Sequence, residues 1–141
     1  MTRIDFHSKV TDRIAYACRL TRKARAADCK VVLLAQDAAQ LRTLDDALWN
    51  FSALDFLPHV AAGDGLADRA PIVLTSSDVD ALPHHQILIN LSGTVPAHFA
   101  RFERLFEIVS GDEAERLAAR ERYTYYKQRG YALTHFDAEK A

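Results

Sequence analysis

Hydrophobic positions along the chain follow two different periods, and their order predicts a protein of the α/β class. Residues 3–8 alternate between apolar and polar side chains, which is typical of a β-strand. In residues 12–27, apolar side chains recur at spacings of three and four and predict a helix with one buried face. In residues 30–35, Lys30 is followed by an unbroken apolar run, which is typical of a strand buried on both faces of a parallel sheet.

The rest of the chain continues this alternation of strands and helices. We expect further strands at residues 71–75, 86–91 and 106–109, with a short strand candidate at 59–62, and further helices at 37–49, 98–104 and 110–130. Such an order predicts about five strands and four helices, arranged as a mostly parallel sheet with helices on both faces. The length of 141 residues, without a linker-like tract, predicts a single domain over residues 1–141.

The helix expected at residues 110–130 has clear signals at both ends. Residues 110–113 read Ser-Gly-Asp-Glu and match the capping-box pattern S-x-x-E, so the helix should begin there. Gly130 is expected to end it. Lys127 and Arg129 lie near the negative end of the helix dipole, where cations are favoured.

Basic and aromatic side chains are concentrated on this helix. Between residues 116 and 129, five basic residues are opposed by Glu121 alone, which gives a local charge of +4 in a chain whose formal net charge is −1. Helical spacing places one set on a single face, namely Arg116, Arg120, Tyr123 and Lys127. An adjacent stripe consists of Arg122, Tyr126 and Arg129, and the apolar side expected to dock on the sheet consists of Ala114, Leu117 and Ala118.

A surface of arginine and tyrosine favours an anionic ligand that also has an apolar or planar part. Arginine binds carboxylates and phosphates bidentately, and tyrosine adds apolar area with a polar tip. An acidic peptide with a terminal aromatic residue would fit, and so would a phosphate backbone. The pattern leaves both ligands open, together with a plain solvated helix face, although the acidic remainder of the chain slightly favours the peptide.

No motif for nucleotide, metal or covalent chemistry stands out. The turn at residues 7–11 has no glycine, although a Rossmann-type phosphate loop would lie there, and Gly63 and Gly65 lack the third glycine of the fingerprint. The six histidines are not arranged in metal-binding HxxxH or HExxH spacing, and no GxSxG elbow occurs. We therefore expect no catalytic residues, no metal and no cofactor.

Composition indicates an ordinary globular protein. Hydrophobic residues make up 49% of the chain and charged residues 26%. No apolar run approaches the roughly 20 residues that span a bilayer. Residues 1–8 lack the hydrophobic region of a signal peptide. We expect a cytoplasmic protein without membrane contact, in which Cys18 and Cys29 are reduced thiols.

Large apolar residues gather after the second expected helix. Five of them occupy nine positions: Trp49, Phe51, Leu54, Phe56 and Leu57. One short connector usually buries fewer, so this segment either packs in the core or exposes an anchor for another protein.

Several segments, in order along the chain, resemble the chi subunit of bacterial DNA polymerase III. They are LDDALW at 44–49, FLPH at 56–59, the loop at 63–65 with Ala70 and Pro71 after it, QILINL at 86–91, residues 99–109, and ARERY at 119–123 with Tyr126 and Gly130. LDDALW and ARERY are the more specific of these. The resemblance implies a Rossmann-like fold without a nucleotide-binding loop, in a non-enzymatic accessory subunit of the polymerase holoenzyme that acts in DNA replication.

The resemblance also implies two protein partners. One is the acidic C-terminal tail of single-stranded DNA-binding protein, which ends in phenylalanine. The other is the psi subunit, which tethers chi to the clamp loader, so that contact with DNA is indirect. Carried over by position, the psi site includes Trp49 and Phe56.

The tail site carried over from the family consists of Val109, Arg116, Arg120, Tyr123 and Lys127. Arg120 would clamp the terminal carboxylate or an aspartate of the tail, and Arg116 would pair with an upstream aspartate. Val109 and Tyr123 would wall an apolar pocket for the phenylalanine ring. Thr124 stands at a position that is often basic in the family, and Lys127 would substitute for it one turn later.

Two functions of other classes stay open. A small nuclease or nucleotide-dependent enzyme would need carboxylates such as Asp37, Asp64 and Asp78 to converge at the carboxyl ends of the strands. A direct single-stranded nucleic-acid-binding module would use the arginine-rich helix and bind bare DNA without a protein coat.

Overall fold

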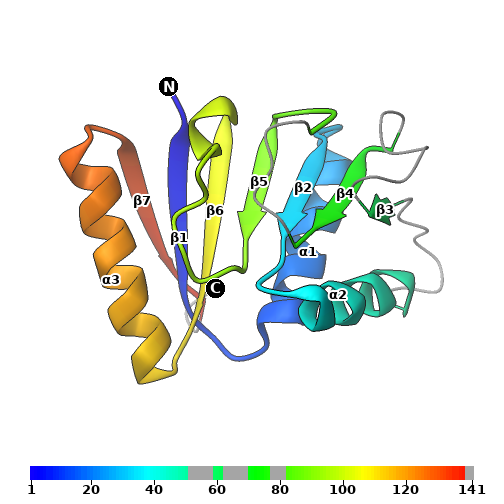
Figure 1. Cartoon of the computed structure of the whole chain (residues 1–141), viewed down its shortest axis with the longest axis horizontal. Helices are drawn as coiled ribbons and strands as arrows, with labels where there is room; N and C mark the ends of the chain where they lie inside the picture. The colour runs from blue at the N-terminus through cyan, green and yellow to red at the C-terminus, as the bar shows by residue number, and fades with distance from the viewer. Residues whose placement is uncertain (51–58, 62–69, 77–81, 139–141) are drawn as a thin grey trace.

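A computed structural model describes residues 1–50, 59–61, 70–76 and 82–138 and contains one seven-stranded sheet (Figure 1). The strands are β1 (Arg3–Val10), β2 (Val31–Leu34), β3 (His59–Ala61), β4 (Ile72–Thr75), β5 (Ile87–Asn90), β6 (Arg104–Ser110) and β7 (Ala132–Asp137). The helices are α1 (Arg13–Ala26), α2 (Ala38–Asn50) and α3 (Glu113–Gln128). The strand order is β3-β4-β2-β5-β6-β1-β7, and every neighbouring pair is parallel.

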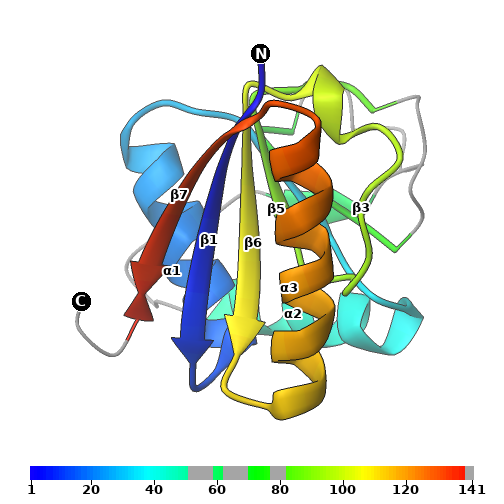
Figure 2. The ribbon, with the colours of Figure 1, turned by 90° about the vertical axis from the view of Figure 1, so that its left-hand side faces the viewer.

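The sheet separates the core into two layers, which confirms the prediction of helices on both faces. Residues of α1 and α2 pack with one set of strand positions, including Val31, Leu33 and Ile108. Residues of α3 pack with the alternate positions, including Ile4 and Phe6 of β1. Figure 2 shows α1 and α3 on opposite sides of β1, β6 and β7. Successive side chains of a strand point to opposite faces, so β1 contributes to both layers.

Two elements differ from the sequence-based expectation. The helix expected at 98–104 is only a 3-10 turn, Phe99–Arg101, followed at once by extended backbone at Phe102. The strand β7 was not expected, because most of its side chains are exposed and a weak alternation does not stand out in sequence. It is an edge strand that pairs with β1 alone. The sheet therefore has more strands than the five or so expected.

The N-cap of α3 lies two residues after the expected one. Asp112, not Ser110, is the N-cap, and its carboxylate accepts a hydrogen bond from the amide of Glu115 at 3.2 Å. The Ser110 hydroxyl instead donates to the Glu115 carboxylate at 2.5 Å. The other end is as expected, because Gly130 has a φ of +81°, the left-handed conformation that follows many helices.

The face of α3 that docks on the sheet is not the expected one. Leu117 is 54% exposed, so the predicted apolar side of Ala114, Leu117 and Ala118 points away from the core. The buried residues are instead Ala119, Arg122 and Tyr126. Arg122 and Tyr126 were expected on an open basic stripe, and that expectation is wrong. Relative to the expected orientation, α3 is rotated about its axis, because a buried carboxylate on β6 needs Arg122 and Tyr126 as hydrogen-bond donors.

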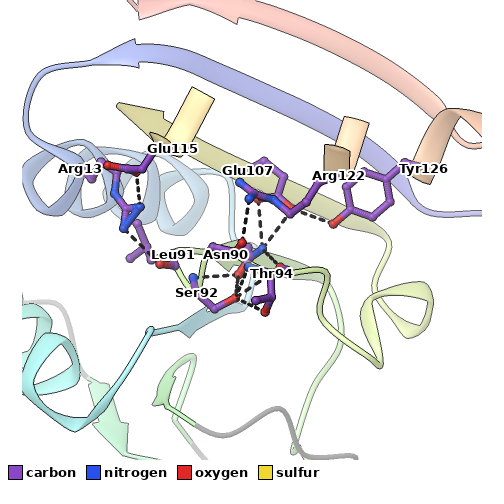
Figure 3. Close-up of polar contacts among 10 residues, drawn as sticks. Arg13, Asn90, Leu91, Ser92, Thr94, Glu107, Glu115, Arg122 and Tyr126 are labelled. Carbon is purple, nitrogen blue, oxygen red and sulfur yellow. Dashed lines mark hydrogen bonds and ion pairs between the residues drawn. The ribbon is translucent and has the colours of Figure 1, made fainter. Parts of the chain in front are cut away.

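That charge is Glu107, whose side chain is fully buried and held by three neighbours (Figure 3). The Tyr126 hydroxyl donates to its carboxylate at 2.6 Å, Arg122 Nε donates at 3.2 Å, and Asn90 Nδ2 donates at 3.0 Å. Arg122 also donates from Nη1 to the carbonyl of Gly93 at 2.9 Å. Burial raises the pKa of Glu107, while the Arg122 charge acts against that shift. A buried carboxylate needs this complete set of donors to be tolerated.

A second polar connection joins the N-terminal ends of α1 and α3 (Figure 3). Arg13 Nη1 forms an ion pair with Glu115 at 2.7 Å, and Arg13 Nη2 donates to the carbonyl of Leu91 at 3.1 Å. The two helices lie on opposite faces, so this pair crosses the carboxyl ends of the strands. It ties the start of α3 to the rest of the domain.

The other face of β1 buries a neutral histidine. His7 is 7% exposed, its Nδ1 lies 2.5 Å from the Tyr16 hydroxyl, and its ring stacks on Phe136. Burial lowers the pKa of His7 from 6.5 to about 4; Asp5 opposes this shift, and the charges of Arg104 and Lys23 add to it.

We predict that Arg122→Ala lowers the free energy of unfolding by about 3–5 kcal/mol, because it leaves Glu107 buried without its counter-charge. Urea unfolding followed by circular dichroism measures this change. Arg120→Ala is the matched control on the same helix, since Arg120 is exposed, and it should change stability by about 0.5 kcal/mol or less. Equal, small losses of unfolding free energy in both variants would contradict the structural role of the Arg122–Glu107 ion pair.

We also predict that acid destabilises the protein partly through His7. The unfolded chain binds a proton on this histidine near pH 6.5 and the folded chain only near pH 4, so the free energy of unfolding falls as the pH falls between these values. His7→Phe should flatten this part of the pH profile. Urea titrations from pH 7 to pH 4 provide the test, and parallel profiles for the two proteins would rule out the contribution of His7.

Candidate peptide-binding site

A pocket of about 360 Å³ lies between α3 and the carboxyl-terminal halves of β1 and β6, with β7 at its side. Its lining comes from four elements: Phe6, Ser8 and Lys9 of β1, Val109 of β6, Arg116, Ala119, Arg120 and Tyr123 of α3, and His135 of β7. Ligands of open α/β sheets commonly bind beside the carboxyl ends of strands. We call this the α3 pocket.

The floor of the α3 pocket is apolar. Phe6, Val109 and Ala119 are only 4%, 3% and 7% exposed. They belong to the core layer between α3 and the sheet, and the pocket opens onto the edge of that layer. The Tyr123 ring packs edge-on against Phe6 with ring centres 5.3 Å apart and forms one wall. A planar or aromatic group would bury apolar surface here and could add an edge-to-face contact.

The rim of the α3 pocket is cationic. Arg116 and Arg120 stand one helical turn apart on the exposed side of α3, and neither forms an ion pair within the described residues. Lys9 lies opposite, at a β1 irregularity where its φ is +57°, and pairs with Asp137 at 3.3 Å. Among the described residues, no carboxylate lines the pocket. An anionic group would therefore meet positive charge on both sides.

The structure brings together four of the five residues expected in the tail site. Val109, Arg116, Arg120 and Tyr123 all line the α3 pocket. Lys127 is exposed on the last turn of α3 and is not part of the lining. Its place in the site stays a prediction.

Sequence reasoning missed the contribution of β1 and β7. Phe6, Ser8, Lys9 and His135 also line the pocket, and the Ser8 hydroxyl lies 2.6 Å from His135 Nε2. For β1, the alternation of residues 3–8 already placed Phe6 and Ser8 on the same face. For His135 there was no signal, because the strand that carries it was not recognised.

The residues expected at the second interface are only partly described. Trp49 lies in the last turn of α2 and is 50% exposed. Phe56 lies outside the described residues. A half-exposed tryptophan at a helix end is compatible with an anchor for another protein, and that role stays a prediction.

The chemistry expected of an enzyme finds little support in the described ranges. Asp12 and Asp37 cap α1 and α2, each accepting a hydrogen bond from a first-turn amide, so the start of α1 that a phosphate would occupy already holds a carboxylate. Asp64 and Asp78, the proposed companions of Asp37, lie outside those ranges. Within them, no cluster of three or more metal-ligating side chains occurs. No helix there combines the length and apolar character needed to cross a membrane.

Sequence comparison decides the family. A family model described as DNA polymerase III chi subunit, HolC, matches residues 1–134. The chain belongs to the DNA polymerase III chi subunit family. The resemblance seen in the sequence is thus confirmed, and it places the chain among the accessory subunits of a replicative DNA polymerase.

Individual members of the chi family align over most of their length. DNA polymerase III subunit chi of Pseudomonas aeruginosa is 35% identical over 137 residues, which is 94% of each chain. The chi subunit of Haemophilus influenzae is 28% identical over 118 residues, 84% of this chain and 82% of that protein. The chi subunit of Escherichia coli K12 is 28% identical over 116 residues, 82% of this chain and 79% of that protein.

Proposed function

We propose that this chi-family protein is a non-catalytic adaptor that binds the acidic C-terminal tail of single-stranded DNA-binding protein. Through a psi subunit it joins that DNA-coating protein to the clamp loader of DNA polymerase III during replication in the cytoplasm. The observation that carries the proposal is the α3 pocket, which combines a buried apolar floor with a cationic rim. A peptide that ends in phenylalanine after several acidic residues has matching chemistry.

The roles of the pocket residues follow from their positions. The terminal phenylalanine ring sits on Val109 and Ala119 and against Tyr123. Arg120, next to that floor, binds the terminal carboxylate through its planar guanidinium. Arg116, one turn toward the start of α3, pairs with an aspartate upstream in the tail. Each arginine has its donors available, because neither is engaged in an ion pair with a described residue.

The psi partner would bind at the opposite end of the sheet from the α3 pocket. Trp49 lies in the last turn of α2, which packs near β4, whereas α3 lies at the end of the sheet formed by β6, β1 and β7 (Figure 1). Such a separation allows both partners to bind at once. Trp49, together with Phe56, would supply the aromatic anchor of this interface.

Direct binding of single-stranded DNA is the rival function. It draws on the same arginines, since guanidinium also binds phosphate. However, Arg122 is buried against Glu107 and cannot reach a ligand, so the basic surface of α3 is smaller than its sequence indicates. The net charge of −1 also gives little attraction for a polyanion.

We predict that Arg120→Ala weakens binding of an acidic peptide ending in Pro-Phe by about 2–5 kcal/mol, because it removes a charged contact at the edge of an apolar floor. Fluorescence anisotropy of a labelled peptide measures the affinity. A peptide that lacks the final phenylalanine, and a bare oligonucleotide, are titrated alongside. Stronger binding of the oligonucleotide than of the peptide would make the protein a nucleic-acid module.

Arg129→Ala is the matched control for that experiment. Arg129 lies at the end of α3 with its guanidinium over the Tyr125 ring, and it does not line the α3 pocket. Its removal should leave peptide affinity within about threefold, which corresponds to the small effect of a remote surface charge. Equal losses in both variants would show that general charge, not the pocket, holds the peptide.

We further predict that peptide affinity falls as salt rises from about 0.05 M to about 0.5 M, because ions screen contacts at the exposed rim. Anisotropy titrations at four salt concentrations measure this dependence. The slope should be shallower for Arg116→Ala, which lacks one of the cations. An affinity that is flat over the range would count against the cationic rim as the binding surface.

A further inference from the structure

A second cavity, of about 420 Å³, lies on the other face of the sheet, between α1 and the strands β1, β6 and β7. From α1 it is lined mainly by one helical face, which includes Tyr16, Leu20 and Lys23. From the strands it is lined by Asp5, His7, Arg104, Phe106 and Phe136. Figure 2 shows α1 and α3 on opposite sides of β1 and β7, so this α1 cavity is separate from the α3 pocket.

Two polar atoms that belong to residues lining the α1 cavity are buried without a hydrogen-bond partner among the described residues. They are His7 Nε2 and Arg104 Nε. Another polar atom of each side chain is engaged, since His7 Nδ1 lies 2.5 Å from the Tyr16 hydroxyl and Arg104 Nη2 pairs with Asp5 at 2.7 Å. Buried polar groups in native proteins are nearly always paired, so two such atoms on residues that line one cavity point to a site for a ligand.

Both atoms are suited to donate. An arginine Nε carries a proton at all times. Burial raises the pKa of the Tyr16 hydroxyl, which therefore stays protonated and can donate to His7 Nδ1. In that arrangement the neutral imidazole carries its own proton on Nε2. The two donors call for an acceptor, and Lys23 at the exposed edge favours one that is negatively charged.

The walls of the α1 cavity are aromatic. The His7 ring stacks on Phe136 with ring centres 5.0 Å apart and meets Phe106 edge-on at 5.5 Å. Phe136 is 45% exposed, although it is a large apolar side chain on an edge strand. Flat rings around a cavity favour a flat ligand.

From these observations we propose that the α1 cavity binds a small aromatic carboxylate. The carboxylate accepts hydrogen bonds from His7 Nε2 and Arg104 Nε, Lys23 adds charge at the entrance, and the ring of the ligand packs between Phe106 and Phe136. Asp5 does not repel the ligand strongly, because its charge is already paired with Arg104. This site is independent of the peptide-binding function proposed for the α3 pocket.

The test uses 2-naphthoate as the probe and its neutral analogue 2-naphthamide as the control ligand. Isothermal titration of the full chain should show binding of 2-naphthoate and at least about tenfold weaker binding of the amide, the loss typical of one charge-assisted hydrogen bond. His7→Phe keeps a ring but removes the donor, and Phe136→Ala removes a wall on an exposed edge. Each should lower 2-naphthoate affinity about tenfold while the circular dichroism spectrum stays unchanged.

Arg120→Ala separates the two sites, because it alters only the α3 pocket. Retained 2-naphthoate binding in this variant, together with its loss in His7→Phe and Phe136→Ala, would support the proposal. Loss in Arg120→Ala with retention in the other two would place the aromatic anion in the α3 pocket and overturn it. Absence of binding to the unaltered protein, or equal affinity for the amide, would overturn it as well.

Discussion

The buried carboxylate of Glu107 determines how α3 lies on the sheet. Glu107 projects from the middle of β6 into the α3-side core, where an unpaired charge would cost several kcal/mol. Arg122 and Tyr126 satisfy it, and both belong to α3. Because these two residues must face the sheet, the rotation of the helix is fixed. Arg116 and Arg120 are consequently placed at the rim of the α3 pocket and Ala119 in its floor.

Strand β1 organises both faces of the domain. Its even-numbered positions Phe6 and Ser8 line the α3 pocket, and its odd-numbered positions Asp5 and His7 line the α1 cavity. The two sites thus share one strand yet differ in character. The first has two arginines on an exposed rim that form no ion pair with a described residue, which suits an acidic peptide. The second has buried donors between aromatic walls, which suits a small ligand.

Much of the fold followed from the sequence, and the failures have physical causes. Periodicity found the strands β1 to β6 and the helices α1, α2 and α3, because their buried residues recur regularly. Strand β7 was missed because an exposed edge strand carries little hydrophobic signal. The expected orientation of α3 about its axis was wrong, because arginine is usually a surface residue, whereas Arg122 is buried. Glu107, with Leu105 and Phe106 before it and Ile108 and Val109 after it, was the sequence signal that a buried partner was needed.

The central claim is that the terminal phenylalanine of an acidic tail binds on the floor of the α3 pocket. The most direct measurement is the detection of intermolecular nuclear Overhauser effects between the ring protons of a bound Pro-Phe peptide and methyl-labelled protein. The account predicts contacts from the ring to the Val109 and Ala119 methyl groups, which lie in that floor. Contacts only to methyl groups on the α1 side, such as those of Leu20, would contradict it.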